Sequence, residues 1–378
     1  MPALHIAQVN FFPAPSDLAL AEVLEQWPSL GDIAEAVASA GMRVSVIQAG
    51  ASSERLTRDG INYHLVDVRS SETAAEKGHR LAEYINEIEP DVLHVHGLGF
   101  AEEASAVSRY LPELPIVLQD HADRPSPWWQ RNQWRSWYSC ASAVAFTAPD
   151  LARPFTRAGM FKAQTSVFAI PESSSRFTPG SRALARAETG LYGDPCVLWV
   201  GHLNVGKDPL VVLDGVARAA TRMPGMRLWC AFGSGALLDR VQRRIDRDPQ
   251  LQGRVHLLGK VNHARVESLM RAADVFVSAS RSESCGYALL EAMACGLPPV
   301  VTDIPSFRAL TGNGRIGRLW PRGDAEKLSE ALISVTRNRP TCKQIRAHFD
   351  ASLSFAAVGR QWAQAYAQVL ESRCGRVT

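Results

Sequence analysis

The sequence predicts an α/β protein with two doubly wound, Rossmann-like domains, each built on a parallel sheet that helices cover on both faces. The first observation is the length of 378 residues, which suits two domains better than one. The second is an alternation of short β-branched runs with longer amphipathic segments, which is typical of a parallel sheet. The third is that this alternation stops at a polar stretch and then starts again. The strand ends of the two domains are expected to meet at a cleft.

Composition narrows the class of protein further. Hydrophobic residues make up 46% of the chain and charged residues 21%, which is average for a globular protein and excludes disordered, collagen-like and coiled-coil chains. No apolar run approaches the roughly 18 residues that a membrane span needs. The first residues lack the pattern of a secretory signal, and the seven cysteines contain no CxxC motif. We therefore expect reduced thiols and a cytoplasmic protein.

Charge is distributed unevenly along the chain. Residues 1–175 carry 13 Lys and Arg against 21 Asp and Glu, whereas residues 176–378 carry 28 against 17. A basic half beside an acidic half suggests that the second half meets an anionic ligand or surface. A drift of charge for solubility alone explains the same counts equally well.

The first half contains seven candidate strands and two clear candidate helices. The helices span residues 29–40, opened by a serine and closed by a glycine, and residues 72–89, followed by a proline. The strands are residues 4–9, 43–48, 63–68, 91–96, 115–119, 143–147 and 165–169.

Residues 171–194, rich in Ser, Pro, Gly and Arg, predict an interdomain linker. The predicted domains are residues 1–175 and 176–353, followed by a C-terminal amphipathic helix within residues 354–378. The candidate strands of the second half are residues 196–200, 227–232, 255–258, 275–278, 299–302 and 316–319.

The segment with the most chemical signals is residues 275–307, VFVSASRSESCGYALLEAMACGLPPVVTDIPSF. It predicts a buried strand, a polar loop and a helix that begins around Gly286. Such a helix start offers backbone N–H groups and the positive end of the helix dipole to a phosphate. Glu283 in the loop and Glu291 on the helix can both face the same cleft. The plain alternative is that the first is a solvated loop charge and the second a surface ion pair.

This segment resembles the signature of retaining GT-B glycosyltransferases, most closely those of family 4. The resemblance rests on the E-x7-E spacing followed by AMACGLP and VVT, and it extends over most of the chain. It implies that Glu283 contacts hydroxyls of the donor sugar and that Glu291 binds the ribose of the nucleotide. It also implies that the backbone of Cys285, Gly286 and Tyr287 holds the phosphates or the sugar. The C-terminal helix would cross back to the first domain, as it does in the family.

A second match is VLWVGHLNVGKDPLVVLDGVA, residues 197–217. The family has Gly-Arg-Leu here with a lysine five residues after the arginine, and both cations bind the diphosphate. Lys207 matches that lysine, although a solvated lysine at a helix start is the alternative. His202 replaces the arginine, so a permanent charge becomes a titratable one, and lower activity at high pH is expected.

Weaker matches extend the resemblance to other strand ends. Gly233 in FGSG would let the backbone approach the nucleotide, and Val261 matches a position that lines the base. In the first half, His121 aligns with a histidine close to the transferred sugar. His94 and His96 share one face of a strand, but no third ligand lies near them, so no metal site is predicted.

Two departures from the family pattern concern the first half. A Gly-Gly loop normally follows the first strand, but residues 10–28 contain no glycine. The Asn-Gly that usually precedes the linker is replaced by Glu172-Ser173.

An aromatic cluster interleaved with arginines is also unusual. It is open whether these side chains form an acceptor platform, a peripheral membrane contact or part of the core. The aromatic members are Trp128, Trp129, Trp134, Trp137 and Tyr138.

The predicted function is transfer of a sugar from a nucleoside-diphosphate sugar to an acceptor hydroxyl, with retention of configuration and no obligatory metal. The predicted catalytic residues are His121, Lys207 and Glu283. A UDP-sugar is preferred on family frequency and a GDP-sugar is the second choice. The acceptor is a saccharide, a lipid-linked glycan or a small natural product, and no nucleic acid is expected. Three rivals stay open: another GT-B enzyme such as a sugar-nucleotide epimerase, an inactive nucleotide-binding homologue, and an unrelated two-domain binding module.

Overall fold

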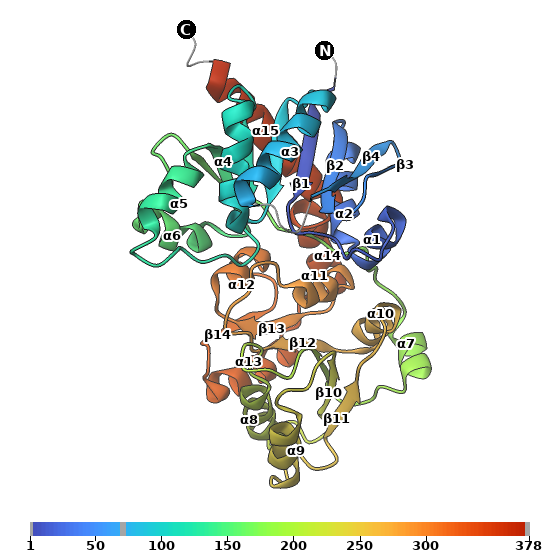
Figure 1. Ribbon diagram of the computed structural model, residues 1–378. Helices are drawn as coiled ribbons and strands as arrows, with labels where there is room; N and C mark the ends of the chain where they lie inside the picture. The colour runs from blue at the N-terminus through green and yellow to red at the C-terminus, as the bar shows by residue number, and fades with distance from the viewer. Residues whose placement is uncertain (1–2, 69–72, 375–378) are drawn as a thin grey trace. The chain divides into compact units, whose positions relative to one another are not determined.

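The computed structural model describes residues 3–68 and 73–374. The chain divides into two compact units (Figure 1). The first comprises Met1–Ser173 and Phe355–Thr378, and the second comprises Ser174–Ser354. Each unit is built on a mainly parallel sheet with helices on both faces, so the predicted fold class is confirmed.

The sheet of the first unit has eight strands in the order β3-β4-β2-β1-β5-β6-β7-β8. Neighbouring strands are parallel except for β3 and β4, which form an antiparallel hairpin at one edge. The strands are β1 His5–Asn10, β2 Arg43–Gly50, β3 Glu54–Arg58, β4 Ile61–Asp67, β5 Val92–His96, β6 Ile116–Gln119, β7 Ala141–Phe146 and β8 Ser166–Ala169.

The hairpin strand β3 is absent from the sequence prediction. Its sequence, ERLTR, is polar and none of its side chains is buried, so it carries no apolar run. Asp59 and Gly60, which join it to β4, have φ values of 53° and 76°. An Asp-Gly pair with positive φ at both positions is the usual turn of a two-residue hairpin, and this signal is present in the sequence.

The sheet of the second unit has six parallel strands in the order β11-β10-β9-β12-β13-β14. In this doubly wound order the chain moves outward from a central pair of strands. The central pair is β9 and β12 in the second unit, and β1 and β5 in the first unit. Ligands of such sheets bind beyond the carboxyl ends of the central strands. The strands are β9 Cys196–Gly201, β10 Arg227–Phe232, β11 Val255–Gly259, β12 Val275–Ser278, β13 Pro299–Thr302 and β14 Arg318–Trp320.

Two layers of helices cover the sheet of the first unit. Four of them (α3 to α6) pack on one face, and α1, α2 and the C-terminal helix α15 pack on the other. Trp362 and Tyr366 of α15 are fully buried, so this helix forms part of the core of the first unit. The helices are α1 Leu20–Gln26, α2 Ser29–Ser39, α3 Ala74–Ile88, α4 Ala101–Tyr110, α5 Arg131–Tyr138, α6 Pro149–Arg157 and α15 Phe355–Cys374.

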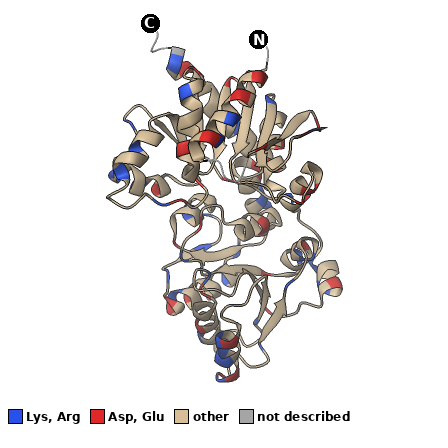
Figure 2. Ribbon diagram, viewed as in Figure 1, with Lys and Arg blue, Asp and Glu red and all other residues tan. Residues whose placement is uncertain are grey.

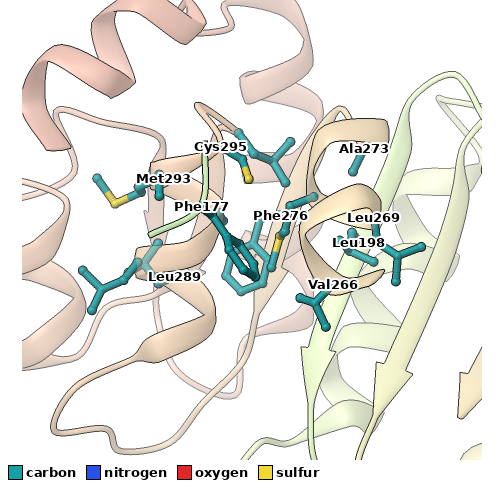
Figure 3. Close-up of a cluster of buried hydrophobic side chains, with 14 of the residues drawn as sticks. Phe177, Leu198, Val266, Leu269, Ala273, Phe276, Leu289, Met293 and Cys295 are labelled. Atoms are coloured by element: carbon teal, nitrogen blue, oxygen red, sulfur yellow. The ribbon is translucent and has the colours of Figure 1, made fainter. Parts of the chain in front are cut away.

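The second unit has the same layered arrangement. One face of its sheet carries a cluster that contains Phe177, Leu198 and Phe276 (Figure 3). The helices on that face are α7 Arg182–Thr189, α10 His263–Ala272, α11 Tyr287–Ala294, α12 Pro305–Leu310 and α14 Cys342–Ser352. Those on the other face are α8 Pro209–Ala220, α9 Leu238–Asp246 and α13 Ala325–Arg337.

Local capping explains where several helices begin. The predicted start of one helix at Ser29 is the first residue of α2. α3 begins at Ala74 because Thr73 and Glu76 form a capping box, in which each side chain accepts the backbone N–H of the other residue. The predicted first residue of this helix, residue 72, lies outside the described residues. Within the described ranges, no helix combines the length and the apolar character that crossing a lipid bilayer requires.

The predicted linker, residues 171–194, is wrong at residues 182–189, which form α7. Ser181 caps this helix by accepting the N–H of Leu184, and Gly190 ends it with a φ of 73°. Ala185 is 5% exposed and packs in the core of the second unit. The last predicted strand is displaced as well, since β14 begins at Arg318 rather than at residue 316.

Candidate functional site

The second unit contains a pocket of about 330 Å³ beyond the carboxyl ends of its central strands. β9 ends beside it at Gly201 and β12 ends beside it at Ser278. This is the position at which doubly wound sheets bind ligands. Of the residues that the sequence predicted, those lining the pocket are His202, Lys207, Gly233, Val261, Glu283, Gly286, Tyr287 and Glu291.

The start of α11 at this pocket depends on Gly286. This residue caps the helix with a φ of 70°, a left-handed conformation that L side chains rarely adopt. A Cβ atom here would also lie 2.9 Å from Cε1 of Phe307. Glycine therefore lets the chain turn directly from the loop into the helix, and the positive end of the helix dipole faces the pocket.

Lys207 and Glu283 form an ion pair within the pocket. The two side chains are 31% and 15% exposed, so water screens the pair only in part. Asn204 Oδ1 accepts the backbone N–H of Lys207 at 3.0 Å and fixes the turn that carries the lysine. In this pair the cation and the carboxylate neutralise each other.

Arg281 joins the two loops that carry this ion pair, and sequence reasoning did not single it out. Its guanidinium contacts Asp208 Oδ2 at 2.8 Å, and its backbone N–H donates to the carbonyl of Gly206 at 2.8 Å. Asp208 has a φ of 45° and stands just before α8. The contact holds the loop after β9 against the loop after β12, which sets the positions of Lys207 and Glu283.

His202 is oriented by the backbone of the next strand end. Its Nδ1 accepts the N–H of Ser234 at 3.1 Å, which leaves Nε2 as the nitrogen that carries the proton. Gly233 permits this approach, because a Cβ atom there would lie 2.9 Å from Cε1 of His202. The imidazole is therefore a hydrogen-bond donor through Nε2 without carrying a positive charge.

Glu291 lies on α11 and contacts a histidine that the sequence analysis missed. Nε2 of His263, the first residue of α10, is 2.8 Å from Oε1 of Glu291. The glutamate side chain is 14% exposed, whereas that of His263 is 74% exposed. His263 also packs against Phe177, with 4.7 Å between the ring centroids. A lone histidine at the start of a helix gives no sequence signal for such a role.

A second polar cluster lies in the first unit, beyond the ends of β5, β6 and β8. Nδ1 of His121 is 2.7 Å from Oε1 of Glu172, and Nε2 of His121 is 3.4 Å from Nδ1 of His96. Burial lowers the pKa of His121, but the hydrogen bond and the charge of Glu172 outweigh it and raise the pKa overall. Burial holds the pKa of His96 well below its ordinary value.

The loop that carries His121 is held by two aspartates. Oδ2 of Asp123 accepts the N–H groups of Leu98 and His121 at 2.9 and 3.2 Å, and so joins the loops after β5 and β6. The N–H of Asp123 donates to Asp120 Oδ1 at 2.9 Å. Burial raises the pKa of Asp120 to about 7. Between them, Ala122 has a φ of 71°, a strained value for a residue with a side chain.

His94 has a structural position. It is fully buried, and its Nδ1 is 2.7 Å from the hydroxyl of Tyr366 on α15. Burial lowers its pKa to about 3, so the ring is neutral. In residues 3–68 and 73–374 no cluster of three or more His, Cys, Asp and Glu is arranged to hold a metal ion.

The aromatic cluster of the first unit divides into two groups. Trp134 and Trp137 of α5 pack against the core, and Tyr138 is 2% exposed. Trp128 and Trp129, which precede the helix, are 76% and 66% exposed. The core explanation therefore fits the residues on α5 and leaves these two tryptophans on the surface.

The helix α5 carries basic residues, coloured blue in Figure 2, whereas the first turn of α4 is acidic. Arg135 donates to the carbonyls of Ala158 and Gly159 and so binds the end of α6. This arginine is therefore part of the packing between helices rather than a solvated charge.

Comparison with known proteins places the chain in a family. Residues 181–348 match the model of glycosyl transferases group 1, and residues 26–171 match the glycosyl transferase 4-like domain. The chain belongs to the group 1 glycosyl transferases. The resemblance inferred from the E-x7-E segment is thus confirmed.

Curated relatives of this group 1 glycosyl transferase include two D-inositol 3-phosphate glycosyltransferases. The protein from Mycobacteroides abscessus is 36% identical over 160 residues, which cover 41% of this chain and 35% of the relative. The protein from Nocardia farcinica is 30% identical over 235 residues, which cover 61% of this chain and 51% of the relative. The chain thus spans between a third and about half of the length of these relatives.

Solved structures show the fold over nearly the whole chain. A glycosyltransferase from Rickettsia africae has a TM-score of 0.76 at 14% identity and covers 98% of this chain and 100% of its own. Anabaena HepE in complex with UDP and glucose has a TM-score of 0.68 at 16% identity and covers 97% and 100%. The two-domain GT-B fold is therefore confirmed.

Two predicted residues of this group 1 glycosyl transferase do not line the pocket of the second unit. The side chain of Cys285 is 4% exposed and packs in the hydrophobic core beside α11. His121 belongs to the first unit, where Glu172, Asp120 and Asp123 surround it. Sequence reasoning noted Glu172 only as a departure from the family pattern.

Proposed function

We propose that this chain transfers a sugar from a nucleoside-diphosphate sugar to an acceptor hydroxyl and retains the anomeric configuration. The observation that carries the proposal is the pocket of the second unit. One cavity contains a lysine, a histidine N–H donor, a helix start and two carboxylates. This set suits a ligand that carries both a diphosphate and several hydroxyl groups.

The diphosphate would bind the lysine and the hydrogen-bond donors of the pocket. Lys207 exchanges its contact with Glu283 for the phosphate oxygens, and His202 donates from Nε2. The start of α11 at Gly286 adds backbone N–H groups and the helix dipole. Negative charge develops on the diphosphate as it leaves, so these groups stabilise the transition state more than the ground state. In this proposal these groups stabilise the negative charge of the diphosphate without an obligatory metal ion.

The two carboxylates would bind hydroxyl groups. An ionised carboxylate only accepts hydrogen bonds, so it pairs with the hydroxyl donors of a sugar or a ribose. Glu283 is released when Lys207 turns to the diphosphate, and it can then bind the transferred sugar. Glu291 on α11 would bind the ribose, with the base near Val261. The volume of about 330 Å³ falls within the usual range of ligand pockets.

A panel of nucleotides tests the donor site directly. UDP, GDP, ADP and dTDP are each added with and without magnesium, and the melting temperature is measured. A nucleotide at 100 times its dissociation constant stabilises the fold by about 2.7 kcal/mol. We expect a clear shift with UDP that does not need magnesium. No shift with any of the four nucleotides would contradict a donor site and would favour an inactive homologue.

Transfer is then measured with UDP-sugars and, second, GDP-sugars. Candidate acceptors are saccharides, lipid-linked glycans and small natural products, to which the names of the curated relatives add inositol 3-phosphate. NMR of the anomeric proton gives the configuration of the product. An inverted product would contradict retention, and conversion of the donor without any acceptor would favour an epimerase.

A further inference from the structure

The cluster around His121 contains a carboxylate for which the proposed function has no role so far. Glu172 follows β8, and its backbone N–H donates to Oγ1 of Thr147 after β7 at 3.3 Å. Its Oε1 lies 2.7 Å from Nδ1 of His121 after β6. The chain thus brings together residues that are 51 positions apart, across the ends of three neighbouring strands.

Burial differs sharply between the two partners. The side chain of Glu172 is 8% exposed and that of His121 is 35% exposed. The carboxylate therefore lies behind the ring, and the ring forms part of the accessible surface. Oε2 of Glu172 is buried and, among the described residues, has no hydrogen-bond partner.

We propose that Glu172 is a positioning residue for His121: its buried carboxylate accepts the Nδ1–H and fixes the plane of the ring, so that Nε2–H can exchange its contact with Nδ1 of His96 for an oxygen of the transferred sugar. This inference rests on the proposed function, because it assigns His121 a substrate in the transfer reaction. His121 is the residue that touches the substrate, and Glu172 acts only through it.

The charges on all sides of the ring favour the protonated imidazole. Glu172 faces it from the end of β8, and Asp120 and Asp123 face it from its own loop. From β5, His94 and His96 also face it, and burial keeps both of them neutral. Together the three carboxylates raise the pKa of His121 although burial opposes them.

Loss of the Nδ1 proton would be costly for the glutamate as well. The ring is the side-chain hydrogen-bond partner of this buried carboxylate, so deprotonation of the ring removes the positive charge that compensates it. The buried carboxylate thus favours the protonated ring over the neutral one. This chain has Glu172-Ser173 where the family pattern has Asn-Gly. The uncharged amide of an asparagine would not stabilise the protonated imidazole in this way.

Three variants test the proposal. Glu172→Gln keeps the shape of the side chain and removes its charge. Glu172→Asp keeps the charge and shortens the reach. Glu113→Gln is the matched control, since Glu113 is 95% exposed and lies before β6, at the opposite end of the strand from His121. For each full-length protein, NMR gives the pKa of the His121 ring without ligand, and the transfer rate is measured against pH.

We expect the pKa of His121 to fall in Glu172→Gln, and the decline of kcat at high pH to move to lower pH by the same amount. Glu172→Asp should restore part of both shifts, and Glu113→Gln should change neither. KM for the donor should change less than kcat, because Glu172 does not touch the nucleotide. If Glu172→Gln does not fold, Glu172→Asp tests the same proposal, because a smaller fall in the pKa of His121 is expected for it.

An unchanged pKa of His121 in Glu172→Gln would overturn the proposal. A lower pKa of the ring without any movement of the kcat profile would also overturn it, because the charge of His121 would then play no part in transfer. Failure of the proposed function looks different: the wild-type chain would transfer no sugar, although the NMR shift would still appear. The two failures are therefore distinguishable.

Discussion

Replacement of Lys207 by alanine is the sharpest test of the donor pocket. The variant removes the ammonium group that the proposal places on the diphosphate. It also leaves Glu283, which is 15% exposed, without the cation that now contacts it. Both effects act on the same bound nucleotide, since an unpaired carboxylate repels the phosphates.

The expected size of the effect follows from the surroundings of the lysine. Removal of one preorganised donor costs about 2.7–4 kcal/mol of transition-state stabilisation, which corresponds to roughly 100- to 1000-fold in rate. The Lys207 side chain is 31% exposed, so water screens part of its charge. His202 and the start of α11 also remain in the variant. We therefore expect a fall in kcat near the lower limit, about 100-fold.

The assay measures kcat and KM for the donor and the dissociation constant of UDP. Lys343→Ala is the matched control, because Lys343 is an exposed lysine on α14 and does not line the pocket. The double variant Lys207→Ala/Glu283→Gln should bind UDP more tightly than Lys207→Ala alone, since the repulsive charge is gone. Unchanged turnover in a folded Lys207→Ala protein would refute the assignment. An equal loss of turnover in Lys207→Ala and in Lys343→Ala would show that the effect comes from the net charge of the protein and not from the pocket.

Three further predictions concern the first unit. Gly359→Ala should destabilise the protein by about 1–3 kcal/mol, because the new Cβ atom would lie 2.0 Å from the carbonyl oxygen of Ala36 on α2. Ala122→Gly should raise stability by up to about 1 kcal/mol, since it relieves a φ of 71° at some entropic cost. Asp120→Asn should stabilise the protein at pH 8, less at pH 5 and hardly at all below pH 4. Burial raises the folded-state pKa of Asp120 to about 7 from 3.8, so its stabilising protonation is complete below pH 4 and is lost as pH rises toward 7, a difference of at most about 4 kcal/mol.

Thermal or urea unfolding measures the stability of all three variants. Each control variant carries a substitution at an exposed or helical position. Gln364→Ala on α15 is exposed and should leave stability nearly unchanged, whereas an equal loss there would contradict the close approach at Gly359. Ala367→Gly in the middle of α15 should cost about 1 kcal/mol, the opposite sign to Ala122→Gly. A stabilisation by Asp120→Asn that is the same at pH 5 and pH 8 would contradict the raised pKa of Asp120.

Most secondary structure was predictable because its signals are local. Residues 227–232, 275–278 and 299–302 were predicted as strands and are β10, β12 and β13 without any change of bounds. Their apolar runs are short and are bounded by turn residues. β3 and α7 were missed, although the first has an Asp-Gly turn and the second has Ser181 and Gly190 as caps. Both lie in polar stretches, where apolar periodicity gives no signal.

The candidate site was predictable only in part. The string around Glu283 and Glu291 identified the family and half of the predicted pocket residues, namely Glu283, Gly286, Tyr287 and Glu291, because those residues lie close together in the chain. Arg281 and His263 gave no comparable signal. Their importance comes from the residues that they contact, and a single sequence does not contain those contacts.

The sequence by itself determined the fold class, most of the strands and several helix starts, because period, caps and turn residues act within a few positions of the chain. It also determined the position of Gly286, where only glycine suits the backbone. Tertiary structure alone decided which side chains meet. Lys207 contacts Glu283 across 76 positions and His121 contacts Glu172 across 51. These pairs form because the sheet order places the carboxyl ends of distant strands side by side, and that order depends on the packing of the whole unit.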